Sequence, residues 1–167
     1  RVPLNPSDES IMRAHLARIP EAWNEISSQI IGAAMEVHTR LGPGLAEKLY
    51  EAALAYELRV AGVRFELQVD VRVPYKDILL PEQRMDLLVE DLWVVELKAV
   101  EKVSDLHLSQ LTSYLRAADK PLGLLVNFNT RSLKDGLFRR LNPRCSRLQQ
   151  LVVTSATTQP STELPLR

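Results

Sequence analysis

Hydrophobic and polar residues alternate most regularly between Val63 and Val73. In this stretch every odd-numbered position is apolar and every even-numbered position is polar. Successive side chains of a β-strand point to opposite faces, so this period of two predicts a strand with one face exposed to water. The stretch covers eleven residues, which is long for a strand, and we expect a bend or bulge within it.

Two helices are predicted before this strand. From Glu25 to Arg40, apolar residues recur at spacings of three and four, which places them on one face of a helix. Gly42 and Pro43 should end this helix, because glycine readily takes the left-handed conformation that follows a helix and proline cannot continue one. The second helix is expected from about Leu45 to Ala61, a stretch rich in alanine and leucine.

Further elements follow the long strand. A second strand is expected at Met85–Val89 and a third at Leu92–Val100, joined by a tight turn at Glu90-Asp91. Ser104 is suited to cap the start of a helix from Asp105 to Ala118. The remaining expected elements are a fourth strand at Leu122–Phe128, a helix at Leu133–Leu141 and a short N-terminal helix at Ser7–Arg18.

This order of elements predicts an α/β fold, bordering on α+β, with a mixed sheet of four strands flanked by helices. The first three strands can form an antiparallel meander, and the helix before the fourth allows a right-handed parallel crossover. We expect residues 1–24 to form an N-terminal arm and residues 25–150 the folded domain. Residues 151–167, rich in Ser, Thr, Pro and Gln, are expected to be a disordered tail.

Composition narrows the class of protein. Hydrophobic residues make up 46% and charged residues 25% of the chain, as in ordinary globular domains. The single cysteine, Cys145, excludes an internal disulfide and suits a reducing compartment, so we expect a cytoplasmic protein. Apolar runs all fall short of the ~18 residues that a membrane span needs, so we expect no membrane partner.

The charges are balanced, with 21 basic and 21 acidic residues. Proteins that grip duplex DNA through many phosphates are usually basic, so this balance argues against a broad non-specific grip. One stretch is nevertheless rich in cations and has Asp135 as its only acid. It is either a solvated helical face or a patch that steers phosphates. Its basic residues are Arg131, Lys134, Arg139, Arg140, Arg144 and Arg147.

Three charged residues interrupt the apolar second and third strands. Glu96 and Lys98 are two positions apart and therefore share one face of the third strand. Asp86, across the predicted turn, should lie almost directly opposite Glu96, where facing side chains start only ~5 Å apart. Carboxylates this close repel unless a cation lies between them, and Mg²⁺ prefers such oxygen ligands. The alternative is a surface salt-bridge cluster, but charge in an apolar strand is costly unless paired or metal-bound.

With these residues the chain resembles the PD-(D/E)XK nuclease superfamily, and within it the group called GxxExxY proteins. The resemblance spans roughly Ile26 to Leu141. One departure is Met85, where the superfamily's name has proline. The matching motifs are Gly44-Leu45-Ala46-Glu47-Lys48-Leu49-Tyr50, Arg84-Met85-Asp86-Leu87-Leu88-Val89, Val95-Glu96-Leu97-Lys98-Ala99-Val100, Gln110-Leu111-Thr112-Ser113-Tyr114-Leu115 and Leu124-Leu125-Val126-Asn127-Phe128-Asn129.

The resemblance implies a role for each matching residue. Asp86 and Glu96 would be metal ligands, with the carbonyl of Leu97 as a third, and Lys98 would be the catalytic lysine. Glu47 matches the acidic residue on the helix before the core that can complete the metal site. A glutamate in the first turn also simply favours the helix dipole, so both readings of Glu47 stay open.

The predicted helix after the third strand carries a second motif. Gln110 and Tyr114 are four apart and share a helix face, and they match the QxxxY element that lines the active-site groove of some exonuclease-like members. His107 joins that face but is expected to be a surface histidine. Tyr50 could belong to the core or to the rim of the site, and His38 could be a partner of the helix dipole.

Together these residues predict a metal-dependent nuclease that hydrolyses phosphodiester bonds of nucleic acid, with DNA favoured over RNA. Mg²⁺ is the expected cofactor and Mn²⁺ a substitute. The alternative is a nuclease-fold module that binds nucleic acid or a protein partner without cutting. The long strand could leave an edge for pairing, so a homodimer or a larger complex also stays open.

Overall fold

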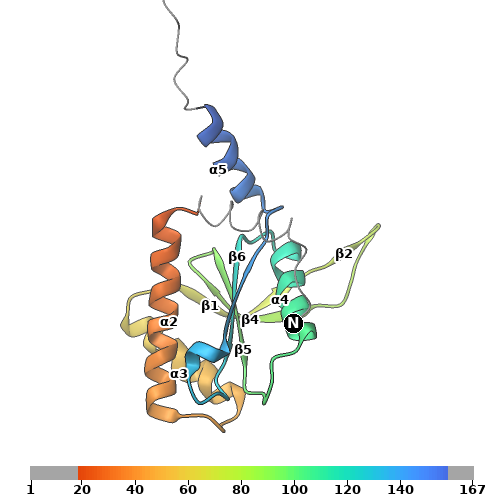
Figure 1. The fold of residues 1–167 in the computed structure, drawn as a ribbon. Coiled ribbons are helices and arrows are strands. Elements are labelled where there is room, and N and C mark those ends of the chain that lie inside the picture. Colours follow the sequence, from red (N-terminus) through yellow and green to blue (C-terminus); the bar gives the residue numbers. More distant parts are fainter. Residues whose placement is uncertain (1–18, 158–167) are drawn as a thin grey trace, which may run out of the picture.

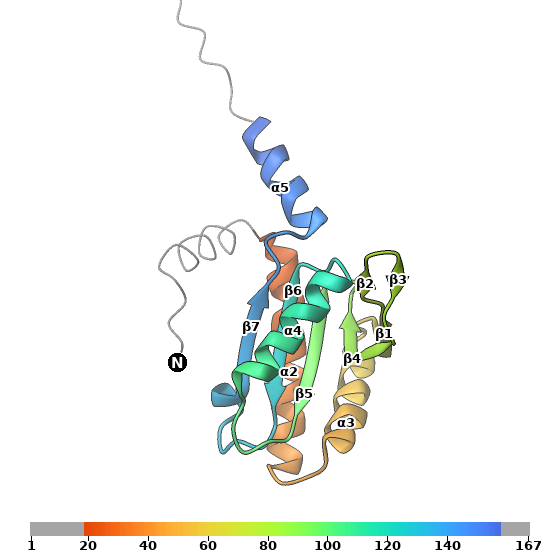
Figure 2. The ribbon, with the colours of Figure 1, turned by 90° about the vertical axis from the view of Figure 1, so that its right-hand side faces the viewer.

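The computed structural model describes residues 19–157. A five-stranded sheet in the order β1-β4-β5-β6-β7 lies between helices. Figures 1 and 2 show α2 and α3 on one face of this sheet and α4 on the other. The elements are α2 (Glu21–Leu41), α3 (Glu47–Val60), β1 (Phe65–Val71), β2 (Pro74–Tyr75), β3 (Ile78–Leu79), β4 (Gln83–Val89), β5 (Trp93–Lys98), α4 (Asp105–Ala117), β6 (Leu122–Asn127), η1 (Leu133–Gly136), β7 (Leu137–Leu141) and α5 (Ser146–Thr157).

The fold class predicted from the sequence is confirmed. β1, β4 and β5 form the antiparallel meander, and α4 connects β5 to the parallel strand β6. The tight turn is made by Glu90 and Asp91, both with positive φ, at 51° and 56°, as in the two-residue turns that match strand twist. Gly42, with φ 64°, follows α2 as expected, and Ser104 caps α4.

The even-numbered positions of the long strand are exposed, as the alternation predicts, but they do not share one face along the whole strand. The expected irregularity lies at Gln68, a non-glycine residue with φ 51°. There the apolar side chains change face. Phe65 packs with the buried cluster beneath α2 and α3, whereas Val69 and Val71 pack with the cluster beneath α4. The ribbon of β1 and β4 is therefore strongly twisted at this point.

The helix predicted over Leu133–Leu141 is wrong. The chain forms a short 3-10 turn, η1, and then β7, which pairs antiparallel with β6 and gives the sheet five strands instead of four. Leu137 and Leu141 belong to the cluster beneath α2 and α3, while Phe138 packs beneath α4. These apolar side chains pack on both faces of the sheet, and a strand buries such a set better than a helix would.

Helix boundaries differ in two further places. α2 begins at Glu21, four residues before the predicted start at Glu25, and α5 runs to Thr157, into the segment expected to be a disordered tail. The helix expected at Ser7–Arg18 and the end of the tail, residues 158–167, lie outside the described residues. Among the helices of residues 19–157, none is long and apolar enough to cross a membrane.

Two glycines allow a matched test of this packing. A Cβ on Gly136 would lie 2.2 Å from the Asn127 carbonyl oxygen, while one on Gly32, inside α2, would meet nothing within 4 Å. We expect Gly136→Ala to lower the free energy of unfolding by about 1–3 kcal/mol or more through overpacking. Gly32→Ala should raise it by up to about 1 kcal/mol, because alanine is the better helix former. Urea denaturation would measure both, and equal stability of the two variants would contradict the predicted contact between β6 and η1.

Candidate active site

The site lies where β4 and β5 separate. Their backbone pairing runs from Val89↔Trp93 to Leu87↔Val95 and ends there, so the next facing residues are Asp86 and Glu96. Their carboxylates take over as acceptors at this point. The Leu97 N–H donates to Asp86 Oδ2 at 2.8 Å, and the Asp86 N–H donates to Glu96 Oε1 at 3.3 Å. The structure thus brings both acids to one point at the centre of the sheet.

Burial and mutual repulsion control the charge of these acids. Glu96 is only 3% exposed, and its burial together with the nearby Asp86 carboxylate raises the pKa of Glu96 to about 8. Burial also raises the pKa of Asp86 above its ordinary value, against the lowering effect of the Leu97 N–H and Lys98. Lys98 Nζ lies 3.6 Å from Glu96 Oε2. One cation beside the buried Glu96 and the half-buried Asp86 leaves the site short of positive charge.

Glu47 reaches the same place from the first turn of α3. Its carboxylate is half-buried and accepts a hydrogen bond from the Ala99 N–H. Burial raises the pKa of Glu47, Lys98 lowers it and Asp86 raises it further. These interactions place Glu47 with the acids of the two strands, rather than at a helix end remote from them.

Tyr50 is a core residue and not part of the site rim. Its ring is fully buried and stacks on Phe128, with 4.4 Å between the ring centroids. Its hydroxyl donates to the Gly42 carbonyl at 2.7 Å and accepts from the Leu45 N–H at 3.1 Å. Tyr50 therefore fixes the loop that leads into α3 and presents Glu47.

The QxxxY pair lies on α4, on the other side of the carboxylates. Gln110 Nε2 donates to the Tyr114 hydroxyl at 2.7 Å. Tyr114 is buried, and burial followed by the charges of Glu96 and Asp86 raises the pKa of its phenol. Tyr114 thus faces the acidic pair from α4, and Gln110 supports it.

His38 and His107 have structural roles. His107 completes the cap of α4, since its Nδ1 accepts from the Ser104 N–H at 3.2 Å and its own N–H donates to Ser104 Oγ. His38 Nε2 lies 2.8 Å from the Thr130 carbonyl oxygen, to which it donates, and so ties α2 to the loop after β6. Neither histidine joins the acidic site.

Two residues at the site were missed from the sequence. Asn127, buried at the end of β6, forms two hydrogen bonds with the backbone of Val100. Its Nδ2 donates to the Val100 carbonyl at 2.8 Å, and its Oδ1 accepts from the Val100 N–H at 3.0 Å. It fixes the chain that leaves β5 after Lys98. The sequence indicated this residue only as an asparagine within an otherwise apolar strand. Gln68, opposite Asp86 on β1, gave no signal, because it is one polar residue among others on a wet face.

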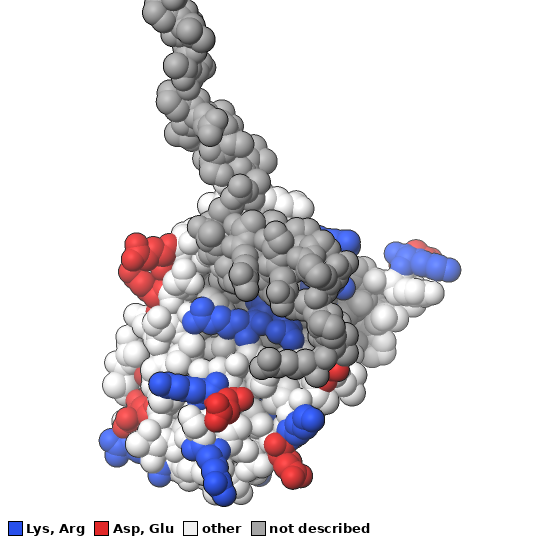
Figure 3. Space-filling view, in the orientation of Figure 1, with Lys and Arg blue, Asp and Glu red and all other residues white. Residues whose placement is uncertain are grey.

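The basic stretch does not form one patch. Arg139 bonds to Ser27 and lies over the Trp93 ring on the side of α2, whereas Arg140, on the next position of β7, faces α4. Arg147 pairs with Asp91. Figure 3 shows acidic and basic side chains interspersed on the visible face. The solvated helical face, one of the two interpretations left open for this stretch, is excluded because residues 137–141 form the strand β7.

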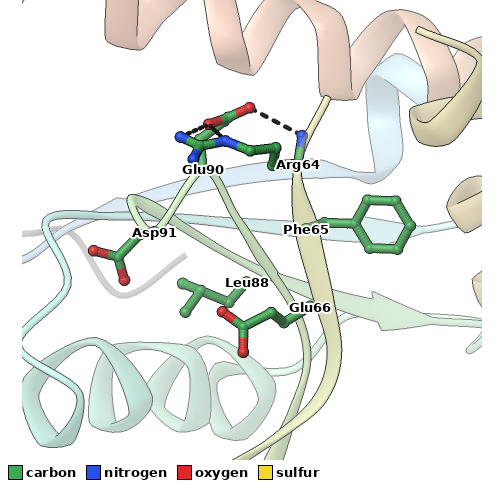
Figure 4. Close-up of a pocket in the computed structure, with 6 residues that line it drawn as sticks. All are labelled: Arg64, Phe65, Glu66, Leu88, Glu90 and Asp91. Atoms are coloured by element: carbon green, nitrogen blue, oxygen red, sulfur yellow. Dashed lines mark hydrogen bonds and ion pairs between the residues drawn. The ribbon is translucent and has the colours of Figure 1, made fainter. Parts of the chain in front are cut away.

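A pocket is present at the turn end of β4, away from the acidic pair (Figure 4). Its wall is held by Arg64, whose guanidinium donates to Glu90 at 2.7 Å. The lining residues are Arg64, Phe65, Glu66, Leu88, Glu90 and Asp91. None of them belongs to the acidic site or to the QxxxY pair, so this pocket is not the candidate active site.

The donor set suits a hard divalent cation. Magnesium usually takes one or two carboxylates and completes its shell with water and phosphate oxygens. Asp86 and Glu96 supply two such carboxylates, one half-buried and one buried, with Lys98 as a neighbouring cation. Within residues 19–157, no three or more His, Cys, Asp or Glu side chains gather closely enough to hold a metal ion by themselves. The arrangement therefore fits an open site better than a structural metal centre.

A mixed sheet between helices, with two acids and a lysine at the point where its central strands separate, defines a restriction-endonuclease-like protein. The family model of the PD-(D/E)XK nuclease superfamily matches residues 24–141, and the chain belongs to this superfamily. Its members are generally nucleases that act on nucleic acid and typically use divalent metal ions. Searches of curated proteins and of solved structures returned no match.

The raised pKa of Glu96 makes stability depend on pH. Without metal, the folded chain keeps a proton up to about pH 8 that the unfolded chain loses near the ordinary value of 4.5. The folded state then binds more protons, so the free energy of unfolding falls as pH rises through this window. Glu96→Gln should remove this loss and gain roughly 2 kcal/mol or more over the wild type at pH 8.5.

Urea denaturation in EDTA at pH 5.5 and 8.5 would measure this effect. Glu82→Gln, which neutralises an exposed carboxylate, is the matched control and should keep the wild-type dependence. An unchanged pH dependence in Glu96→Gln would show that this carboxyl group is not the source.

Proposed function

We propose that the protein is a divalent-metal-dependent nuclease that hydrolyses phosphodiester bonds of nucleic acid, with DNA favoured over RNA. The observation that carries this proposal is the facing pair of carboxylates, the half-buried Asp86 and the buried Glu96, with Lys98 3.6 Å from Glu96. Membership of the PD-(D/E)XK nuclease superfamily supports it, and so does the match to the GxxExxY motif at residues 44–50.

Asp86 and Glu96 would bind the metal, with the Leu97 carbonyl and Glu47 as further ligands. The expected ion is Mg²⁺, with Mn²⁺ as a substitute, and when bound it would polarise the scissile phosphate and lower the pKa of a coordinated water. Its binding would also relieve the repulsion that raises the pKa of Glu96. The shortage of positive charge at the site supports this assignment.

Lys98 would hold or deprotonate the attacking water, or offset charge on the phosphorane. Its side chain is 15% exposed and extends beside Glu96, so its ammonium group acts in a partly desolvated place where electrostatic interactions are strong. A charged donor in such a place stabilises negative charge as it develops. This is the role that the proposal assigns to the lysine.

Gln110 and Tyr114 would orient the substrate from α4. The Tyr114 oxygen already accepts the Gln110 amide hydrogen, so its own hydrogen is free to be donated to a phosphate oxygen. The raised pKa of the phenol keeps that hydrogen in place at neutral pH. The pair would thereby set the path of the backbone next to the acids.

A second candidate is a nuclease-fold module that binds nucleic acid or a protein partner without cutting. The neutral net charge favours this reading. A homodimer or larger complex would fit either function, and β1 is an edge strand of the sheet. Cleavage and metal binding distinguish the two functions, because a binding module requires neither.

The nuclease proposal is tested with Lys98→Met. Cleavage of labelled single-stranded, duplex and flap DNA and of RNA would be followed with Mg²⁺, with Mn²⁺ and with EDTA. We expect wild-type activity that EDTA abolishes, and a rate about 100-fold or more lower in Lys98→Met, the loss typical of a missing group in proton transfer.

Lys134→Met, at an exposed position on η1, removes the same charge elsewhere and should keep the wild-type rate. Wild-type protein that is inactive on all four substrates, or full activity in Lys98→Met, would overturn the catalytic proposal. Binding of the same substrates without cleavage would favour the second candidate.

A further inference from the structure

Gln68 interrupts the pairing of β1 with β4 at the point where Asp86 lies. Leu67↔Leu87 and Val69↔Met85 are paired on either side, so Gln68 is directly opposite Asp86. Its φ of 51° is a left-handed conformation that non-glycine residues rarely adopt. Such strain persists when surrounding contacts enforce it, and it clusters at functional sites.

The carboxamide of Gln68 contacts two acids from different elements. Its Nε2 donates to Glu51 Oε2 on α3. Its side chain, opposite Asp86 across the strand pair, also lowers the pKa of Asp86 against the effect of burial. A glutamine amide has two hydrogens to donate, and these two acceptors can use both of them.

Glu51 lies one helical turn after Glu47 on α3, so the two share a helix face. Gln68 therefore connects the strand acid, Asp86, to the helix that carries Glu47.

We propose that Gln68 is a positioning residue of the active site. It holds the Asp86 carboxylate in the orientation required for a divalent cation and fixes that carboxylate relative to α3. This inference rests on the proposed metal-dependent function. Hydrogen bonds to a metal-binding carboxylate orient it, and losing such a partner typically weakens metal affinity about 10–100-fold.

The left-handed backbone makes Gln68→Gly a sharp test. Glycine adopts φ near 51° without strain, so this variant removes the side-chain interactions with Glu51 and Asp86 and relaxes the backbone at once. If Gln68 had a purely structural role, its replacement by glycine would then leave the metal affinity unchanged. A positioning glutamine would leave a folded protein with a weaker metal site.

Isothermal titration with Mn²⁺ alone gives the primary readout. We expect the Kd to rise about 10-fold or more in Gln68→Gly and in Gln68→Ala, with thermal unfolding of Gln68→Gly close to that of the wild type. The cleavage rate of Gln68→Gly should recover at high Mn²⁺, because the lost orientation weakens binding and not the chemical step. Lys76→Gly, at another left-handed position, φ 54° in the β2–β3 turn, is the matched control and should keep the wild-type Kd.

The outcomes separate the two proposals. If the wild type binds Mn²⁺ and cuts, Asp86→Asn loses binding and Gln68→Gly keeps the wild-type Kd, Gln68 is not a positioning residue while the nuclease proposal stands. If the wild type neither binds Mn²⁺ nor cuts, the proposed function fails and the role of Gln68 fails with it. Weaker binding that parallels a loss of folding in both Gln68 variants would also contradict the inference.

Discussion

The separation of β4 and β5 at Asp86 and Glu96 is the constraint on which the site depends. Backbone groups freed inside a sheet must find other partners, and here the two carboxylates provide them. The Leu97 N–H bonds to Asp86 and the Asp86 N–H bonds to Glu96. The carboxylate oxygens of Asp86 and Glu96 are therefore needed as hydrogen-bond acceptors where the pairing of β4 and β5 ends. The same oxygens are costly to bury in their charged form. A proton or a cation at the site removes the cost of burying these charges. The stability of the sheet and the chemistry of the site therefore depend on the same carboxylates.

Packing in the core on the α2 and α3 side of the sheet determines where α3 places the carboxylate of Glu47. Tyr50 stacks on Phe128, the residue after β6, and its hydroxyl holds the Gly42–Leu45 loop from within the core. Glu47 follows that loop at the start of α3. The glycine, glutamate and tyrosine of residues 44–50 therefore have distinct physical tasks, which are to turn the chain, to present a carboxylate and to anchor the turn. The tyrosine acts on the site through Glu47 and has no contact with it of its own.

Local patterns predicted the parts of the fold that local rules decide. Alternation predicted the exposed positions of β1, and a spacing of two put Glu96 and Lys98 on one face. The segment at 133–141 failed because leucines four apart suit a helix, while the buried strand β6 needed a partner along its open edge. That need is a property of the assembled sheet. Gln68 was missed for a similar reason, since its bridge depends on α3, a helix that ends before β1 begins.

Balanced charge is compatible with a nuclease when attraction for phosphate is local. Several surface cations are already committed to acids, as in Arg64 with Glu90 and in Arg147 and Lys120 with Asp91. Cations held in this way contribute little to a broad field around the protein. In the proposed function, attraction for a polyanion would come in part from Lys98 and from a divalent ion held by the acidic pair. Binding of nucleic acid would accordingly depend strongly on metal and only weakly on the release of counterions, which is the reverse of the pattern expected for a basic protein that grips duplex DNA along its backbone.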